Sequence, residues 1–433
     1  MPSQQKTGYY TFLVIYILAI FSIGSWVERY QTVPLLLAYC SAFMGYVFIS
    51  IKREDSKTLL SVGILVRILL FISLPTLSDD LYRFIWDGTL LKNSIHPFAQ
   101  LPSYYLDNPV EGLSQELYDR LNSPNYFSIY PPLNQLIFWL SVTLGQSDWL
   151  FSANIIRVIL VAADVGSFFL LRKLLKLYDK PTSLAYWYWL NPLVILEFTG
   201  NLHFEGLVVF FLLTGIYFFE KNRKSLSAAG LGLAIGMKLL PMIYLPFLFL
   251  KGLKNKKWWI SIVAGLIAIV TLLPMLDTTF LKGMQTSLNL YFRSFEFNAS
   301  SYFIAREIGT WIYGYNNIAL IGPLLSALSF ISIMVISIIA YLKNWSLPKT
   351  FLFILTIYLI FATTVHPWYI LPLVAFGILS GYWYSIIWSF LIFFTYIGYH
   401  KDGFELPMFI IVIEYLITGL ALLFELRMKK VKT

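Results

Sequence analysis

The stretch YYTFLVIYILAIFSIGSW, at residues 9–26, carries no charged side chain. Similar apolar runs of about 17–25 residues recur as far as Phe424, and a helix of that length crosses a hydrocarbon layer about 30 Å thick. Of the 433 residues, 58% are hydrophobic and 13% charged, with a mean hydropathy of +0.70. One soluble core cannot bury that much apolar surface. The sequence therefore predicts an all-α, polytopic membrane protein.

The first apolar run, the single cysteine and the net charge exclude several kinds of protein. No small-residue cleavage pattern follows the first run, so it is predicted to be a retained helix and not a signal peptide. Cys40 is the only cysteine, which excludes a disulfide framework and a cysteine metal site. The net charge of +9 would suit a nucleic-acid partner in a soluble protein, but its placement beside apolar runs argues against one.

Basic residues gather in clusters that the positive-inside rule places in the cytoplasm. These clusters are Lys52/Arg53/Lys57, Arg172/Lys173/Lys176/Lys180, Lys221/Arg223/Lys224, Lys251/Lys254/Lys256/Lys257, Lys343/Lys349 and Arg427/Lys429/Lys430/Lys432. Acidic and aromatic segments between them are predicted to face outward, at residues 77–130, 200–205, 277–316, 366–368 and 400–406. The chain is predicted to be one domain, 1–433, in which outer loops 76–130 and 277–316 form much of the active site.

The alternation of inner basic clusters with outer segments fails at two places if every apolar run is a full span. Residues 225–250 have basic residues at both ends and contain Lys238 and Pro241, so we expect two half-length helices meeting near an outward-facing Lys238. Within residues 131–171, one of two apolar runs is expected to be shallow or re-entrant, without a choice between them. The count is then about 12 to 14 membrane segments, including broken or re-entrant helices, with both termini inside.

The segment SDDLYRFIWDG, at residues 78–88, is the richest in candidate catalytic groups, and IHPF follows it at 95–98. If it is helical, Asp80, Arg83 and Asp87 share one face, and Asp79 lies beside them. A solvated helix cap with an ion pair is the plainer alternative.

A second set of polar residues lies at the edge of apolar runs. Glu197, His203 and Glu205 are expected near the same outer boundary, because ionisable groups in membrane helices usually line a polar cavity. Alternatively, Glu197 only bonds a neighbouring helix. Lys238, at the tip of a broken helix, suits a phosphate, although lysines near helix ends also snorkel to the interface.

Other candidates come from the later outer segments. Arg293 and Arg306 could bind phosphate oxygens, and His366 and Tyr369 lie at another outer helix end, where Trp368 is expected in the interfacial aromatic belt. Loop arginines are more often plain surface residues. The four histidines show no two-ligand spacing on one helix, so no metal and no other cofactor is expected. A structural ion pair is expected between Arg157 and Asp164.

In sequence order, the motifs resemble the GT-C superfamily of polytopic glycosyltransferases, above all its bacterial mannosyltransferase-like branch related to the GPI mannosyltransferase catalytic subunit. The elements that carry the resemblance are SDDLYRFIWDG with IHPF, YPPL, NPLVILE with GNLHFE, GMKLLPMIYLP, FNASSYFIAREIG and HPWYILPL. They run from about residue 77 to 374, and each is loose alone.

That resemblance implies inverting transfer of a hexose, mannose in this branch, from a polyprenyl-phosphate donor to an acceptor hydroxyl outside the cytoplasm. The acceptor would be a glycan, a lipid or another hydroxyl compound, and the enzyme would lie in a bacterial inner membrane with its site facing outward. The base would be Asp80 or Asp79, since the chain has adjacent aspartates where the GPI enzymes have D-x-D. The other candidates are expected to contact the donor phosphate (Lys238, Arg306, Arg293 and His366) or the substrates more generally (Arg83, Asp87, Glu197, His203, Glu205 and Tyr369).

Two other classes remain open from the residues alone. A transporter or lipid-linked sugar flippase would also use broken helices and buried charges, but would not need a roughly 50-residue outer loop headed by aspartates. A non-catalytic assembly subunit would have no essential carboxylate.

Overall fold

The computed structural model describes residues 3–52, 56–254, 256–293 and 295–431, and its regular structure is almost entirely helical. Within those ranges the strands form one antiparallel hairpin, β1 (Tyr399–His400) with β2 (Gly403–Phe404). The predicted all-α class is confirmed. Arg53 and Lys432, from two of the basic clusters, lie outside the described residues.

Five helices are long and apolar enough to cross a membrane: α1 (Ser3–Ser25), α2 (Thr32–Lys52), α8 (Trp149–Leu177), α17 (Ile318–Leu342) and α21 (Met408–Val431). Two sharply bent pairs raise the count to seven if each pair is one span. One joins α10 (Pro192–Ile195) and η3 (Leu196–Gly200) to α11 (Glu205–Glu220) at 113°. The other joins α14 (Trp259–Leu272) and η5 (Leu273–Met275) to α15 (Thr278–Arg293) at 115°. The chain is therefore an integral membrane protein with five to seven candidate spans among the described residues, and the predicted count of 12 to 14 segments is not confirmed.

Shorter elements complete the fold. Before α11 these are α3 (Ser56–Leu69), η1 (Leu70–Ile72), α4 (Asp80–Lys92), α5 (Tyr104–Asp107), α6 (Gln115–Asp119), α7 (Pro132–Gly145), η2 (Thr182–Ala185) and α9 (Tyr186–Trp189). After α11 come α12 (Lys224–Met237), η4 (Leu240–Tyr244), α13 (Leu245–Lys254), α16 (Ser301–Tyr313), α18 (Leu347–Phe361), η6 (Pro367–Ile370), α19 (Leu371–Ser380), α20 (Tyr384–Leu391) and η7 (Ile392–Gly398).

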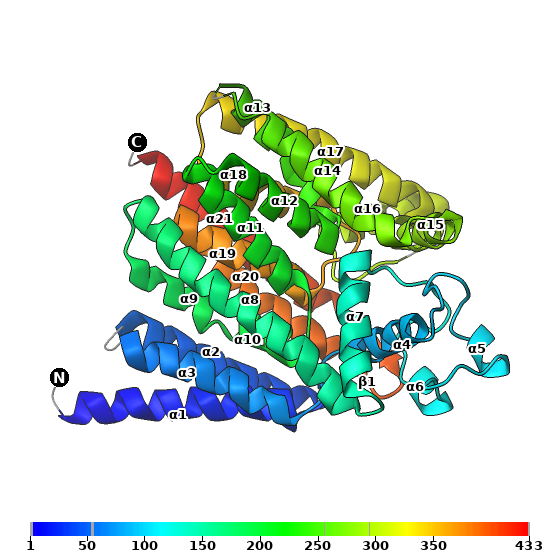
Figure 1. Ribbon diagram of the computed structural model, residues 1–433. Coiled ribbons are helices and arrows are strands. Elements are labelled where there is room, and N and C mark those ends of the chain that lie inside the picture. Colours follow the sequence, from blue (N-terminus) through cyan, green and yellow to red (C-terminus); the bar gives the residue numbers. More distant parts are fainter. Residues whose placement is uncertain (1–2, 53–55, 255, 294, 432–433) are drawn as a thin grey trace.

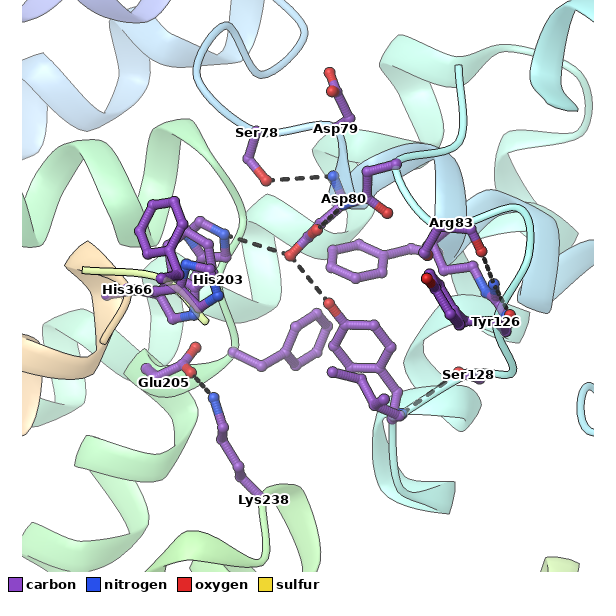
Figure 2. A pocket seen from close by; sticks show the side chains of 18 of the residues that line it. Ser78, Asp79, Asp80, Arg83, Tyr126, Ser128, His203, Glu205, Lys238 and His366 are labelled. Carbon is purple, nitrogen blue, oxygen red and sulfur yellow. Dashed lines mark hydrogen bonds and ion pairs between the residues drawn. The ribbon is translucent and has the colours of Figure 1, made fainter. Parts of the chain in front are cut away.

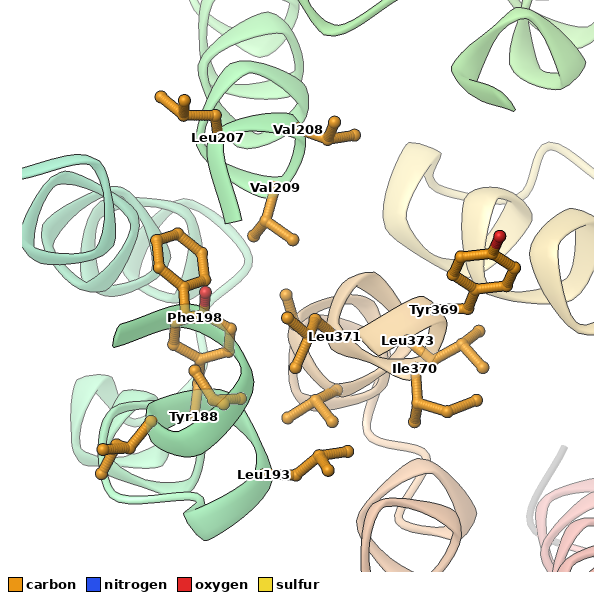
Figure 3. Close-up of a cluster of buried hydrophobic side chains, with 14 of the residues drawn as sticks. Tyr188, Leu193, Phe198, Leu207, Val208, Val209, Tyr369, Ile370, Leu371 and Leu373 are labelled. Atoms are coloured by element: carbon orange, nitrogen blue, oxygen red, sulfur yellow. The ribbon is translucent and has the colours of Figure 1, made fainter. Parts of the chain in front are cut away.

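The loop-borne elements gather at one end of the helical bundle. Figure 1 shows α4, α5, α6, α15 and β1 at the end opposite to both chain termini. Outer loops 76–130 and 277–316, far apart in sequence, thus lie at the same end, as the charge pattern predicted. At that end η6 and α19 pack against α10, η3 and α11, and Figure 3 shows the apolar side chains that fill this core, including Leu193, Phe198, Val209 and Leu371.

The predicted helix break at Lys238 is confirmed. Helix α12 ends at Met237, and Lys238 follows in an extended conformation before η4 and α13. Pro241 favours the break, because proline has no N–H to donate to a carbonyl one turn earlier. The ambiguity in residues 131–171 also resolves: α7 has 14 residues, so it is about 21 Å long and too short for a full span, whereas α8 has 29.

The expected ion pair between Arg157 and Asp164 is wrong. Seven residues on one helix are about 10 Å apart along its axis, which is too far for contact. Asp164 instead accepts a 2.6 Å hydrogen bond from Nε of Arg67. The guanidinium carbon of Arg67 also lies 3.6 Å from the Trp189 ring centre. Arg157 donates to the carbonyl oxygen of Thr199 at 2.8 Å. Both arginines therefore join helices that are distant in sequence.

We expect Asp164→Asn to destabilise the bundle, because it leaves the Arg67 guanidinium buried without its counter-ion. Breaking a buried ion pair typically costs about 3–5 kcal/mol. The free energy of unfolding should be measured by denaturant titration in mixed micelles, with exposed Asp107→Asn as the control. Equal stability of the two variants would contradict this role for the ion pair.

Candidate active site

A cavity of about 450 Å³ lies where α4, the break before α11, the break after α12 and the start of η6 meet. Figure 2 shows Asp80, His203 and Lys238 converging on it from three different elements. Eight of the candidate residues line it: Asp79, Asp80, Arg83, His203, Glu205, Lys238, His366 and Tyr369. Asp87, Glu197 and Arg306 are not among the lining residues.

Asp80 is the first residue of α4, where the partial positive charge of the helix N-terminus favours a carboxylate. Its Oδ1 accepts a 2.6 Å hydrogen bond from Asn122, and its Oδ2 accepts one of 3.0 Å from the Tyr130 hydroxyl. Nε2 of His203 lies 3.5 Å from Oδ2, at ion-pair distance. Burial raises the pKa of Asp80, but His203, Asn122 and Tyr130 outweigh it and hold the pKa below the ordinary value. The carboxyl group is therefore ionised at neutral pH.

Asp79 has a different environment. It does not cap α4 with its side chain but pairs with Arg29, whose guanidinium also lies 4.7 Å from the Tyr399 ring centre. Arg29 lines the cavity and comes from the connection between α1 and α2. Sequence reasoning missed it, although the alternation of sides already placed this connection outside. The two adjacent aspartates thus have separate partners.

Arg83 and Asp87 form the predicted charged pair, but it supports the cavity wall. Arg83 donates to Asp87 at 2.9 Å and to the carbonyl oxygen of Tyr126 at 2.9 Å. Asp87 is fully buried and also accepts hydrogen bonds from Ser128 at 2.5 Å and Gln135 at 2.9 Å. This network holds the 123–135 segment, which carries Tyr130, against α4. In this structure, Asp87 cannot touch a ligand in the cavity.

Glu197 is also fully buried, in the π-helical turn η3. Its Oε2 faces Nδ1 of His203 at 2.9 Å and accepts a 3.0 Å hydrogen bond from Asn201. Its Oε1 accepts a 2.8 Å hydrogen bond from the Tyr396 hydroxyl. The alternative considered for Glu197, a bond to a neighbouring element, therefore describes its contact with Tyr396. It reaches the cavity only through His203.

Lys238 pairs with Glu205, the first residue of α11, and its ammonium lies 4.2 Å from the Tyr369 ring centre. The same three residues begin a second, much smaller apolar groove of about 20 Å³. It continues between Val208, Leu212, Leu240, Pro241, Tyr244, Leu355 and Pro372. A cation therefore lies where the larger cavity meets a small apolar groove.

Trp368 is not free to join an interfacial belt, as the sequence suggested. Its indole ring lies between the imidazole rings of His203, at 3.7 Å, and His366, at 4.4 Å, measured between ring centres. The Phe297 ring packs against His366 in a tilted arrangement, with 4.4 Å between ring centres. Phe297 is held there by backbone hydrogen bonds with Thr363 and Val365. A continuous stack of rings thus forms one wall of the cavity.

The two later arginines do not line the cavity as candidate phosphate ligands would. Arg306 pairs with Glu296 at 2.8 Å and with Glu307 at 3.2 Å, and only Glu296 of these lines the cavity. Arg293 is the last residue of α15, and its side chain lies outside the described part of the chain. A phosphate role for either arginine stays a prediction.

A polytopic helical membrane protein with an acidic cavity at one end is the class that these observations define. Residues 13–253, more than half of the chain, match the family described as alpha-(1->6)-mannopyranosyltransferase, N-terminal domain, and the chain belongs to this family. It is 22% identical over 219 residues to alpha-(1->6)-mannopyranosyltransferase A of Corynebacterium glutamicum. That alignment covers 47% of this chain and 41% of the relative, so the chain matches about two fifths of the relative's length. No solved structure matches the chain significantly. The resemblance to the bacterial mannosyltransferase branch is confirmed.

We expect acid to destabilise the protein through His366. Burial lowers the pKa of His366 to about 3 from its ordinary value of 6.5, so the unfolded chain binds a proton at a higher pH than the folded one. Stability from this group is therefore complete above pH 6.5 and is lost as the pH falls toward 3. Between pH 7 and pH 5 the loss is about 2 kcal/mol.

The measurement is the free energy of unfolding at both pH values for the wild type, His366→Gln and the exposed control His400→Gln. His366→Gln should lose about 2 kcal/mol less than the other two on acidification. An identical loss in all three would show that His366 does not remain neutral in the fold.

Proposed function

We propose that the protein is an inverting glycosyltransferase that moves mannose from a polyprenyl phosphate to an acceptor hydroxyl. The carrying observation is the ionised Asp80 carboxylate in a cavity whose other side, at Lys238, opens into an apolar groove. Membership of a mannopyranosyltransferase family supports the sugar and the reaction type. The relative from Corynebacterium glutamicum is named an alpha-(1->6)-mannopyranosyltransferase, which suggests a 6-hydroxyl acceptor, such as that of another hexose.

In the proposed reaction Asp80 is the general base. The acceptor oxygen forms a bond to the anomeric carbon while the bond from that carbon to the phosphate oxygen breaks. The acceptor proton passes to Asp80, and the electron pair of the broken bond stays on the phosphate, which becomes more negative by one charge. Attack opposite to the departing phosphate inverts the anomeric centre. Asp80 is favoured over Asp79 because Asn122 and Tyr130 orient its carboxylate, whereas Asp79 is held in a direct ion pair with Arg29.

Lys238 is the proposed partner of the donor phosphate. Its ammonium is about one-third exposed and its present counter-ion, Glu205, is on the cavity wall, so a phosphate could share or take over the cation. The adjoining groove is apolar, as the first carbons of a polyprenyl chain require. A donor held in this way would enter sideways from the bilayer, with its sugar directed toward Asp80.

The proposed orientation follows from charge. Basic clusters flank the bundle end that carries the termini, whereas α4 and the cavity are at the opposite end. We place the protein in a bacterial inner membrane with the cavity facing away from the cytoplasm.

We expect Asp80→Asn to reduce turnover by about 10²- to 10⁴-fold, the usual contribution of a general base. Asp79→Asn should cost less, because its carboxylate orients Arg29 and does not take the proton. Turnover of a mannosyl polyprenyl phosphate with octyl α-mannoside should be measured for both folded variants. Near-normal turnover in Asp80→Asn would disprove the assignment, and near-normal turnover in both would show that neither aspartate is the base.

We expect Lys238→Met to weaken donor binding by about 1–3 kcal/mol, the range for a hydrogen bond to a charged group. Arg306→Gln should weaken it less, because two carboxylates already hold that guanidinium. Each substitution should be combined with Asp80→Asn, and binding of the intact donor should be measured by titration calorimetry in micelles. Because these proteins are inactive, the measurement separates affinity from turnover. An unchanged dissociation constant in the Lys238 variant would remove this residue from the phosphate site.

A further inference from the structure

The imidazole of His203 lies between two carboxylates that come from different helices. Nδ1 is 2.9 Å from Oε2 of Glu197, and Nε2 is 3.5 Å from Oδ2 of Asp80. The ring is 3% exposed and is stacked on Trp368. It cannot turn without losing both carboxylates and the stacking contact.

The doubly protonated ring is the form that fits this place. Only an imidazolium can donate from both nitrogens, whereas a neutral ring would present a lone pair to one of the two carboxylates. Glu197 favours the same form, because it also accepts hydrogen bonds from the uncharged Asn201 and Tyr396, and a buried carboxylate requires a cation. Glu197 therefore holds the orientation and the charge of His203 from behind.

The contacts of the Asp80 carboxylate account for three of its lone-pair positions. A carboxylate offers about four lone-pair positions. Asn122 occupies one on Oδ1, and Tyr130 and His203 occupy the two on Oδ2. The remaining lone pair is therefore on Oδ1, beside the one that Asn122 occupies.

We propose that His203, held by Glu197, is a positioning residue for Asp80: it fixes the rotation of the carboxylate and keeps it ionised, so that Oδ1 receives the acceptor proton. This inference rests on the proposed function of Asp80 as the base. It assigns Glu197 and His203 a role other than direct contact with substrate. The cost is a weaker base, since a nearby cation stabilises the unprotonated carboxylate.

Other charges around His203 leave this arrangement intact. Glu205 and Lys238 form their own ion pair, and the guanidinium of Arg157 is bonded to the carbonyl oxygen of Thr199 on η3. His366, behind Trp368, is neutral because burial lowers its pKa to about 3. The charged or titratable groups in contact with His203 are therefore Asp80 on α4 and Glu197 on η3. Glu197 in turn contacts Tyr396 on η7.

The first test is the pH dependence of kcat with a mannosyl polyprenyl phosphate donor and octyl α-mannoside. His203→Gln should lower kcat by about 100-fold at pH 7, the size of effect that misplacing a reacting group can have. It should also move the acid limb of the profile to higher pH and leave the KM for the donor unchanged. Glu197→Gln should move the same limb in the same direction, and the double variant should match His203→Gln alone, because Glu197 acts through His203. His400→Gln, an exposed histidine outside the cavity, should match the wild type.

The second test needs no turnover. In protein labelled with ¹³C at the aspartate carboxyl carbons, the Asp80 signal is identified by its absence in Asp80→Asn. Its titration should move to higher pH in His203→Gln and in Glu197→Gln. If it moves while even the wild type transfers no mannose, the charge arrangement is correct and the proposed function fails.

Two results would overturn the positioning role in an active enzyme. One is an acid limb and an Asp80 titration that stay unchanged in both single variants. The other is a loss expressed only in the donor KM, which would make His203 a substrate ligand. Should His203→Gln fail to fold, Glu197→Gln carries the test alone, because its amide keeps the size of the side chain and can still accept from Tyr396.

Discussion

The contact between Glu197 and His203 holds together the sharp bend between η3 and α11. The helix that enters as α10 and η3 leaves as α11 at 113°, and the four residues between them expose backbone groups that a straight helix would satisfy internally. Asn201 and His203 both return to Glu197, and Arg157 covers the carbonyl oxygen of Thr199. Because this bend is fixed, His203 meets α4 and Glu205 points toward Lys238. The shape of the cavity depends on it.

Charge compensation is the second constraint on the cavity. Among the described lining residues, Arg29, Arg83 and Lys238 are each paired with a carboxylate. Unpaired charges would be costly in a bundle with so little water. The proposed anionic donor would have to exchange one of these pairings, which would limit its affinity but favour a ligand whose charge lies where the displaced carboxylate was. Selectivity would come from this exchange.

The sequence predicted the features of the fold and site that depend on neighbouring residues better than it predicted contacts between residues distant in the chain. The break at Lys238 followed from basic residues on both sides and Pro241, and the common location of the two outer loops followed from alternation. The partners of Asp164, Asp79 and Glu197 lie 97, 50 and 199 residues away in Arg67, Arg29 and Tyr396, where no spacing rule applies. The prediction for Trp368 was wrong for the same reason. The sequence around an aromatic residue at a helix end does not show whether its ring contacts lipid or packs against two histidines. The predicted 12 to 14 membrane segments stay a prediction, because short apolar helices such as α7 and α19 are not among the five to seven candidate spans.

The small size of the apolar groove at Lys238 has a consequence for lipid length. A space of about 20 Å³ cannot enclose more than the first carbons of a hydrocarbon chain. Every isoprene unit beyond them would lie in the bilayer, where its environment is the same with or without the protein. Binding energy from such units would cancel between the free and bound states. If the donor is the proposed polyprenyl phosphate, the protein would contact only its phosphate and the unit next to it, and short and long carriers would bind alike.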